Sequence, residues 1–208
     1  NVTTSATSQI LAGKGITIRG DERRNGDVAD PGDADPGHGT IMNLAGTIGS
    51  INAPTSTARG FTSIYGNNDD DTFIFNQTHL TANTRVYASQ YDTATTADGN
   101  DRFYVYQLQS MNIDRAGNGD TLTLDGEGGS NDYYIYTSGS QHAANNYVIN
   151  VLDSGGRADG VNELFIYGAP STLNAPADPT NDIFLLRSMS FIPNEPEATS
   201  PAFVGLLH

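Results

Sequence analysis

Hydrophobic and polar positions alternate along most of the chain. The alternating stretches are rich in Val, Ile, Tyr, Phe and Thr, as in "RVYAS", "TLTLDG" and "YVINVLD", and they end in segments rich in Gly, Asn and Asp. A period of two residues is typical of strands, and patterns with the helical period of 3.6 residues are scarce. The sequence therefore predicts an almost all-β protein.

From residue 60 onward one short pattern recurs, an acid followed two positions later by an aromatic residue. Its copies are "DDDTFIF" (69–75), "GNDRFYV" (99–105), "SNDYYIY" (130–136), "VNELFIY" (161–167) and "TNDIFLL" (180–186). The aligned acids are Asp71, Asp101, Asp132, Glu163 and Asp182; the first four follow at nearly equal intervals, and the fifth follows after a much shorter one. Near-equal steps indicate repeated units that stack on one another.

Stacked parallel coils place equivalent side chains in columns about 4.8 Å apart. The alignment predicts a core column made of Phe73, Phe103, Tyr134, Phe165 and Phe184. Strand alternation sends the next residues to the outer face, and these are Ile74, Tyr104, Ile135, Ile166 and Leu185. Because this outer column is apolar or aromatic, we expect either residues 1–57 or another subunit to cover it as an interface.

The predicted fold class is a parallel β-solenoid, a β-roll or β-helix, with coils of about 30 residues that each carry two strands. Residues 58–190 hold the repeats. Residues 1–57 are expected to form a strand-rich cap or lead-in with one acidic loop, "GDVADPGDADPGHG", and residues 191–208 a proline-rich C-terminal segment.

The charge balance narrows the class of partner. Ten Lys and Arg stand against 24 Asp and Glu, which gives a net charge of −14 and leaves Lys14 as the single lysine. Nucleic-acid binding rests on clustered cationic side chains, so a nucleic-acid partner is not expected. The apolar runs are far shorter than the roughly 20 residues of a membrane span. The chain has no cysteine, so no thiol serves as a ligand or nucleophile.

The acidic turns are candidate calcium sites. Calcium takes 6 to 8 oxygen ligands at about 2.3–2.6 Å, and turns of Asp, Asn and Gly supply such oxygens without bulky obstruction. The candidate ligands are Asp69, Asp70, Asp71, Asp98, Asn100, Asp101, Asp120, Asp125, Asn131, Asp132, Asp153, Asp159 and Glu163. The alternative is structural, because Asn and Asp favour turns, and a ladder of asparagines can bond one coil to the next.

Catalytic machinery is not apparent in the sequence. The arginines of the repeats are scattered, and the net charge would repel a polyanionic substrate. His38, His79, His142 and His208 show no metal-ligand spacing. With 24 acids, some carboxylate pair always lies near enough to suit a glycosidase, so that signal alone decides nothing. We therefore expect a protein without enzymatic activity.

Three stretches resemble a known family. "GNNDDDTFIF", "DGNDRFYVY" and "TLTLDGEGGSNDYYIY" are similar to the degenerate, haemolysin-type (RTX-like) calcium-binding repeats of very large bacterial secreted or surface proteins. The resemblance covers roughly residues 60–190, and it implies a parallel β-roll or β-helix, export from the cell, and calcium in the turns. The strict nonapeptide of such repeats is nowhere intact, so one calcium per turn is not implied.

Three functions remain in view. The leading interpretation is an extracellular, secreted or cell-surface, structural and adhesive module stabilised by calcium. The first alternative is a carbohydrate-active β-helix enzyme or a carbohydrate-binding module, since ten tyrosines suit contact with surface carbohydrate. The second is a subunit of a self-assembling filament or layer, in contact with neighbouring copies. A cleft with converging carboxylates would favour the enzyme, and large apolar contacts between chains would favour the filament.

Overall fold

Strands form all the regular structure in the part of the chain that the computed structural model describes. These residues are 1–20, 39–52, 60–66, 69–88, 99–110, 120–137, 148–155, 160–168, 183–188 and 202–207. None of them belongs to a helix that is long and apolar enough to cross a membrane. The prediction of an all-β fold is confirmed.

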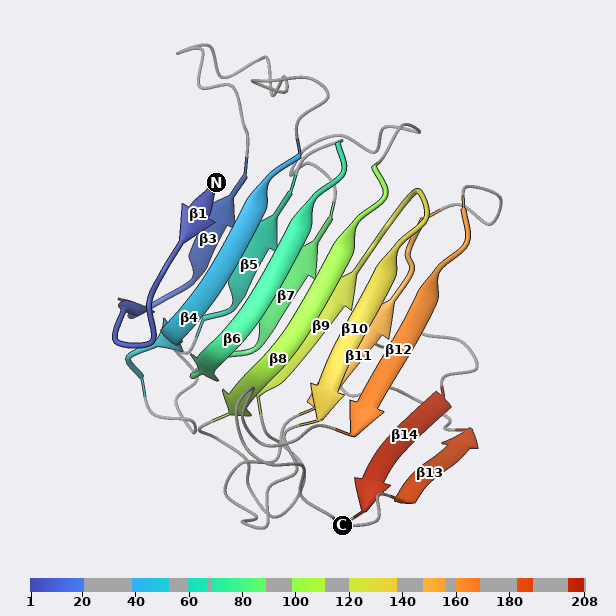
Figure 1. Ribbon diagram of the computed structural model, residues 1–208. Coiled ribbons are helices and arrows are strands. Elements are labelled where there is room, and N and C mark those ends of the chain that lie inside the picture. Colours follow the sequence, from blue (N-terminus) through green and yellow to red (C-terminus); the bar gives the residue numbers. More distant parts are fainter. Residues whose placement is uncertain are drawn as a thin grey trace.

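Two parallel sheets make up most of the structure (Figure 1). Sheet A has seven strands, namely β1 (Val2–Thr3), β2 (Gln9–Ala12), β4 (Ile41–Ser50), β6 (Thr72–Leu80), β8 (Arg102–Ser110), β10 (Asp132–Thr137) and β12 (Glu163–Gly168). Sheet B has five, namely β3 (Ile16–Arg19), β5 (Thr62–Tyr65), β7 (Thr84–Tyr87), β9 (Thr121–Asp125) and β11 (Val148–Leu152). The prediction of parallel pairing is confirmed.

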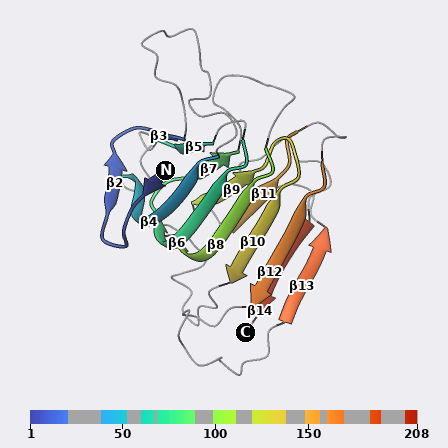
Figure 2. The same cartoon turned by 45° about the horizontal axis from the view of Figure 1, so that its top comes forward.

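The chain alternates between the two sheets. Each strand of sheet A from β4 to β10 is followed by a strand of sheet B, and we call such a pair of strands a pass. Successive passes lie side by side in chain order in both sheets, as Figure 2 also shows. A parallel pair requires a crossover connection between its strands, and here the strand of the opposite sheet lies within each crossover.

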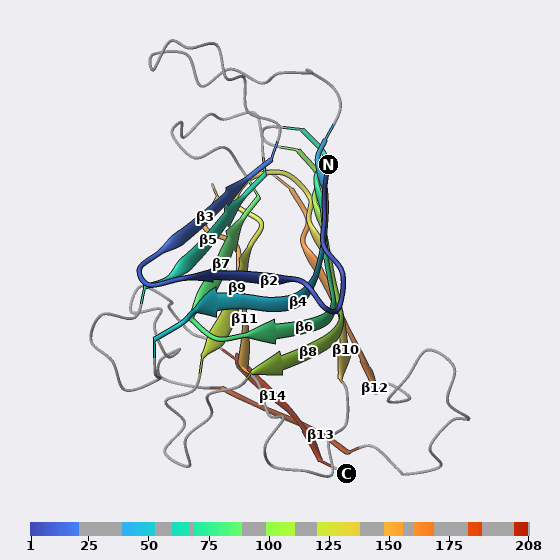
Figure 3. The ribbon, with the colours of Figure 1, turned by 90° about the vertical axis from the view of Figure 1, so that its left-hand side faces the viewer.

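The long strands of sheet A bend in the middle. Pairing shifts register between Leu44 and Gly46, and again around Asn76 in the next strand. Gly46 has a φ of +78°, and a Cβ there would overlap the carbonyl oxygens of Ser5 and Ser8, so glycine is required. Bulges of this kind turn a strand. The stack therefore looks three-sided when it is viewed along its axis (Figure 3).

The hydrophobic core lies between the sheets. Phe73, Phe103 and Tyr133 point inward and stack, with ring centroids 5.1 Å apart for the first pair and 4.8 Å apart for the second. All three side chains are buried, and Val86 and Leu124 of sheet B belong to the same cluster. Burial raises the pKa of the Tyr133 hydroxyl, which donates a hydrogen bond to the carbonyl oxygen of Leu152 at 2.9 Å.

The repeat alignment predicted from the sequence is shifted by one residue from β10 onward. Phe103 pairs with Tyr133, not with Tyr134, so Asp101 aligns with Asn131. Tyr134 and Phe165, which the sequence placed in the core, therefore stack on the outer face. Ile135 and Ile166, which the sequence placed outside, turn inward; Ile135 is buried, and Ile166 packs against the core. Phe73, Phe103, Ile74 and Tyr104 lie on the expected faces, because the step between their two copies is correct.

The described residues within 1–57 extend the stack. Strands β1 and β2 pair with β4, and β3 pairs with β5, so the described part of this segment adds strands to the end of both sheets. It does not fold over the outer face of sheet A, which was one of the two covers expected for the column at Ile74 and Tyr104. The sequence missed these passes because Thr40 stands where the later passes have an acid or asparagine.

The fifth copy of the repeat is not a further parallel strand. β13 (Ile183–Ser188) pairs antiparallel with β14 (Ala202–Leu207) in a separate two-stranded sheet. The interval between Glu163 and Asp182 is too short for a full pass, which carries two strands and their connections. Asp182 lies outside the described residues, as do the side chains of Phe184 and Leu185.

Candidate functional site

Polar side chains form a ladder at the corner where the chain enters sheet A. This inner ladder consists of Asp71, Asp101, Asn131 and Asn162, one from each pass. The Asp71 amide donates to Asp101 Oδ1 at 2.7 Å, the Asp101 amide to Asn131 Oδ1 at 2.9 Å, and the Asn131 amide to Asn162 Oδ1 at 2.8 Å. Each side-chain oxygen thus satisfies the backbone of the preceding pass.

A second, outer ladder runs one residue earlier and in the opposite direction. The Asn100 amide donates to Asp70 Oδ1 at 2.7 Å, the Ser130 amide to Asn100 Oδ1 at 2.8 Å, and the Val161 amide to Ser130 Oγ at 3.0 Å. Carboxylate, amide and hydroxyl oxygens all serve in this ladder. These positions therefore select a hydrogen-bond acceptor and not a negative charge.

Two glycines, each directly after a strand of sheet B, make room for the inner ladder. A Cβ at Gly66 would overlap Asp71 Oδ2 and the carbonyl oxygen of Ala88, and a Cβ at Gly126 would overlap the Asn131 side chain. Asn131 fills the space beside Gly126 and donates from Nδ2 to the carbonyl oxygens of Gly126 and Gly128, both at 2.9 Å. The corner is therefore closely packed as well as hydrogen-bonded.

The structure distributes the other candidate calcium ligands over several contacts. Asp132 faces Arg102 at 3.8 Å, Asp153 accepts a hydrogen bond from Asn162 Nδ2 at 2.8 Å, and Asp125 is paired with Arg85. Asp69 and Asp120 take part in interactions, and Glu163 is exposed. Asp98 and Asp159 lie outside the described residues.

The described residues do not build a calcium cage. Within the ranges that the structure describes, no three His, Asp or Glu side chains come together in a group that could hold a metal ion. The oxygens of the two ladders bind backbone N–H groups instead. The structural alternative therefore accounts for the ladder residues, and calcium at the turns stays a prediction.

Chelation tests the calcium prediction. Asp71 and Asp101 are buried neighbouring carboxyl groups that repel each other when both are ionised, and a bound cation would relieve that repulsion. A ligand that binds only the native state stabilises it by about 2.7 kcal/mol at 100 times its dissociation constant. Calcium at the turns thus predicts a lower melting temperature in chelator, restored by added calcium and not by added magnesium. Identical melting curves with and without chelator would contradict calcium binding.

Six aromatic side chains cover the outer face of β8, β10 and β12, and we call this surface the tyrosine face. It is formed by Tyr104, Tyr106, Tyr134, Tyr136, Phe165 and Tyr167. The rings form two columns across the strands. In the first column, the Tyr134 ring centroid lies 4.8 Å from that of Tyr104 and 5.0 Å from that of Phe165. In the second, the Tyr136 ring centroid lies 5.0 Å from that of Tyr106 and 4.8 Å from that of Tyr167. The rings are half-exposed, which makes an uncharged surface on a strongly acidic protein.

Stacking covers the flat faces of the rings within each column. Tyr134 is nearly parallel to both of its neighbours, with interplanar angles of 7° and 8°, so each of its faces meets another ring. The ring edges are the parts left for contact with a partner, and the Tyr134 hydroxyl lies 3.4 Å from Asp132 Oδ2. A sugar ring stacks on a free aromatic face, so the middle of the tyrosine face does not suit that contact. Stacked aromatic pairs contribute about 0.5–1.5 kcal/mol each beyond burial.

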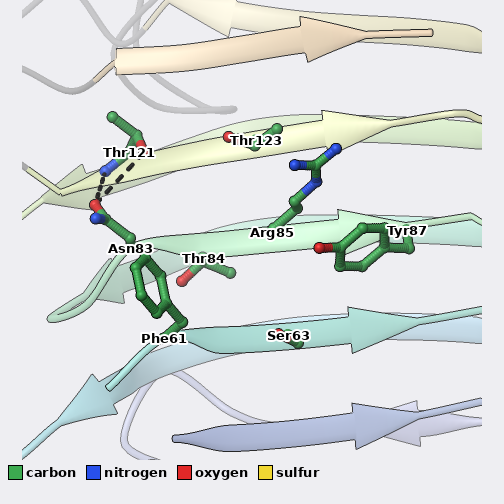
Figure 4. Close-up of a pocket in the computed structure, with 8 residues that line it drawn as sticks. All are labelled: Phe61, Ser63, Asn83, Thr84, Arg85, Tyr87, Thr121 and Thr123. Atoms are coloured by element: carbon green, nitrogen blue, oxygen red, sulfur yellow. Dashed lines mark hydrogen bonds between the residues drawn. The ribbon is translucent and has the colours of Figure 1, made fainter. Parts of the chain in front are cut away.

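A groove lies on the outer face of sheet B (Figure 4). Its volume is about 290 Å³, and it is lined by Phe61, Ser63, Asn83, Thr84, Arg85, Tyr87, Thr121 and Thr123. These residues come from three passes, on or beside β5, β7 and β9. Phe61 lies beside Asn83 at one end of the groove, Tyr87 lies at the other end, and Arg85 lies between them.

Arg85 dominates the electrostatics of the groove. Its Nη2 contacts Asp125 Oδ2 at 2.5 Å, and its guanidinium lies 4.8 Å from the centre of the Tyr87 ring. Tyr65 stacks on Tyr87 with centroids 4.8 Å apart. Burial raises the pKa of Tyr87 more than the adjacent Arg85 lowers it. Asp125 is fully buried, so it neutralises Arg85 and is not presented to solvent.

Sequence reasoning found two of the three strands of this groove but not the groove itself. The sequence predicts "RVYAS" and "TLTLDG" as second strands of their coils, and β7 and β9 confirm them. The outward alternation of Ser63 with Tyr65, and of Arg85 with Tyr87, was the available signal. Sheet B strands are unevenly spaced in sequence, however, so nothing in the sequence showed that these pairs are neighbours.

Comparisons with known proteins found no match. No protein-family model, no curated protein and no solved structure matches the chain. The case for function therefore rests on the two ladders, the tyrosine face and the groove.

Proposed function

We propose that the chain is a β-solenoid module of an extracellular structural and adhesive protein, without catalytic activity. Passes that stack in order, bonded by the two ladders, support the solenoid part of the proposal. In such a fold each pass buries its apolar side only against its neighbours, and the module acts as an extended rigid scaffold. The resemblance of residues 60–190 to secreted bacterial repeats supports the location outside the cell.

The tyrosine face is the observation that carries the adhesive role. Tyrosine is enriched at protein interfaces because it supplies a large, amphipathic contact area that loses little conformational entropy. Six half-exposed aromatic rings on one side of a protein with a net charge of −14 form a surface on which another chain can pack with little charge repulsion. A neighbouring copy or repeat of the same protein, which presents the same hydroxyl groups and ring edges, suits this surface.

The groove favours binding over catalysis. A general acid or base must come within hydrogen-bonding distance of the substrate. Asp125, the acid paired with Arg85, is fully buried and does not line the groove. A carboxylate that is covered and already paired is poorly placed to act on a bound polysaccharide, which argues against the enzyme alternative.

Beads coated with the purified protein test this proposal. We expect the beads to cluster, and we expect clustering to be lost in the double variant Tyr134→Ser/Tyr136→Ser, which removes the centre of the tyrosine face. Ile51→Ser is the matched control, because Ile51 is 66% exposed but lies outside that face. Each variant must keep the circular dichroism spectrum of the parent.

Four results would contradict the proposal. Parent beads that do not cluster, or variant beads that cluster as the parent does, would remove the tyrosine face from the account. Release of reducing ends from neutral or acidic polysaccharides by the purified protein would favour the enzyme alternative. Discrete, growing fibres at high protein concentration would instead identify a filament subunit.

A further inference from the structure

The groove on sheet B holds polar groups that the protein itself does not use. Asn83 accepts a hydrogen bond from the Thr121 amide through Oδ1 at 3.0 Å, which leaves its Nδ2 group without a partner among the described residues. The Ser63 hydroxyl likewise has no hydrogen-bond partner within the described ranges. Both groups line the groove (Figure 4) and are available to a ligand.

The charges around the groove exclude ionic ligands. The positive charge of Arg85 is compensated by Asp125, so an anion meets no net positive site in a protein of net charge −14. A cation cannot reach Asp125, because that carboxylate is fully buried and already paired. A purely apolar ligand would cover Asn83 and Ser63 and leave their polar groups unsatisfied, which is costly. The remaining class is a neutral ligand that is rich in hydroxyl groups.

Phe61 gives this ligand an apolar contact. Its side chain is 65% exposed at the end of the groove, next to Asn83. The middle rings of the tyrosine face, Tyr134 and Tyr136, each have a ring on both sides, and Tyr87 lies between Tyr65 and the guanidinium of Arg85. Phe61, in contrast, stacks on no aromatic ring among the described residues. A sugar ring has one apolar face of C–H groups and an edge of hydroxyl groups, and this combination matches Phe61 with Asn83 and Ser63.

We propose that the groove between β5, β7 and β9 binds a neutral sugar ring. The ring would stack on Phe61, accept a hydrogen bond from Asn83 Nδ2, and exchange hydroxyl contacts with Ser63. A volume of about 290 Å³ lies at the small end of ligand pockets, which hold about 300–1,000 Å³, so it suits one or two sugar units. This proposal goes beyond the adhesive role of the tyrosine face, because the two surfaces belong to different sheets.

Titration of the protein with simple sugars tests the site. The neutral probes are the methyl glycosides of glucose, galactose, mannose and N-acetylglucosamine, and the charged probes are glucuronic acid and glucosamine. Binding is followed by saturation-transfer difference NMR and by shifts of the Asn83 side-chain amide signals. We expect at least one neutral glycoside to bind with a Kd on the order of 1 mM, as befits a ligand with few atoms, and neither charged sugar to bind as tightly.

Variants locate the binding. Phe61→Ala removes the ring, and Asn83→Asp keeps the oxygen that accepts from Thr121 but removes the Nδ2 donor. We expect each change to weaken binding by about three- to tenfold, a loss typical of one good aromatic or polar contact. Ile51→Ala, another exposed apolar side chain, lies outside the groove and serves as the control that should bind like the parent.

Any of three results would overturn the proposal. These are saturable binding by none of the neutral glycosides, unchanged binding in Phe61→Ala, and tighter binding of glucuronic acid or glucosamine than of every neutral glycoside. Equal melting temperatures of the parent and Phe61→Ala show that any loss is local. Bead clustering through the tyrosine face is measured separately, so failure of this site and failure of the adhesive role are distinguishable.

Discussion

Phe103→Ala is expected to lower the free energy of unfolding by about 3–5 kcal/mol, as other large-to-small changes in protein cores do. Phe103 is fully buried, and it stacks between Phe73 on one side and Tyr133 on the other. Its loss leaves a cavity in the middle of the core column, and the neighbouring passes, held by backbone pairing on both sides, have little freedom to close it. Chemical denaturation of the parent and the variant measures the difference.

The neighbouring residue supplies the control for this prediction. Tyr104 lies on the same strand but on the outer face, half-exposed and stacked on Tyr134. Tyr104→Ala should cost about 0.5–1.5 kcal/mol, the contribution of an aromatic pair, because no buried cavity forms. A larger loss for Tyr104→Ala than for Phe103→Ala would mean that the two faces of the strand have been exchanged.

Asn131→Ala is expected to cost about 3 kcal/mol or more, because each buried polar group left without a partner costs about 1–3 kcal/mol. The change removes one acceptor and two donor contacts, to the amide of Asp101 and to the carbonyl oxygens of Gly126 and Gly128. Asn131 is fully buried, so water cannot replace these contacts. Thermal and denaturant unfolding measure the loss.

Two variants separate the causes of that loss. Asn100→Ala removes a single contact of the outer ladder, to the amide of Ser130, at an exposed position, and should cost about 1 kcal/mol or less. Asn131→Asp keeps the acceptor oxygen for Asp101, but it turns a buried carboxyl oxygen toward the carbonyl oxygens of Gly126 and Gly128, so it should cost at least as much as Asn131→Ala. Equal stability of Asn131→Ala and the parent would show that the inner ladder does not stabilise the stack.

The sequence predicted the strands and their parallel stacking because sheet A repeats evenly. Paired residues along sheet A follow one another at nearly equal intervals, as Ile41, Thr72, Arg102, Asp132 and Glu163 show. Sheet B is uneven, since the interval from Ile16 to its partner Thr62 is more than twice the interval from Thr62 to its next partner, Thr84. The connections within each pass differ in length and make up for the uneven spacing of sheet B. Only the strands of sheet A therefore recur at a regular interval in the sequence.

The one-residue error in register has a chemical cause. Aligning acids selects negative charge, whereas the inner ladder requires only a side-chain oxygen that accepts a hydrogen bond. Asn131 meets that requirement as well as Asp101 does, and Asp132 follows Asn131 directly, so the alignment moved to the acid. The adjacent Tyr133 and Tyr134 hid the error, since either aromatic residue could fill the core. A shift of one residue exchanges the two faces of a strand.

The candidate sites were predictable only in part. The apolar, aromatic character of the outer face followed from alternation, but its correct members, Tyr134 and Phe165, required the register. The groove depends on Phe61, Asn83 and Arg85, which belong to passes with unequal spacing and share no motif. Their proximity is a property of the folded sheet B, and a single sequence does not contain it.

Nuclear Overhauser contacts of the Phe103 ring test the stacked register most directly. The structure places the Phe103 ring 4.8 Å from the ring of Tyr133, centre to centre, and places Tyr134 on the opposite face of the sheet with Tyr104. We expect cross-peaks between the ring protons of Phe103 and those of Tyr133, and none between Phe103 and Tyr134. Cross-peaks from Phe103 to Tyr134 in place of Tyr133 would contradict the core column, both ladders and the tyrosine face together.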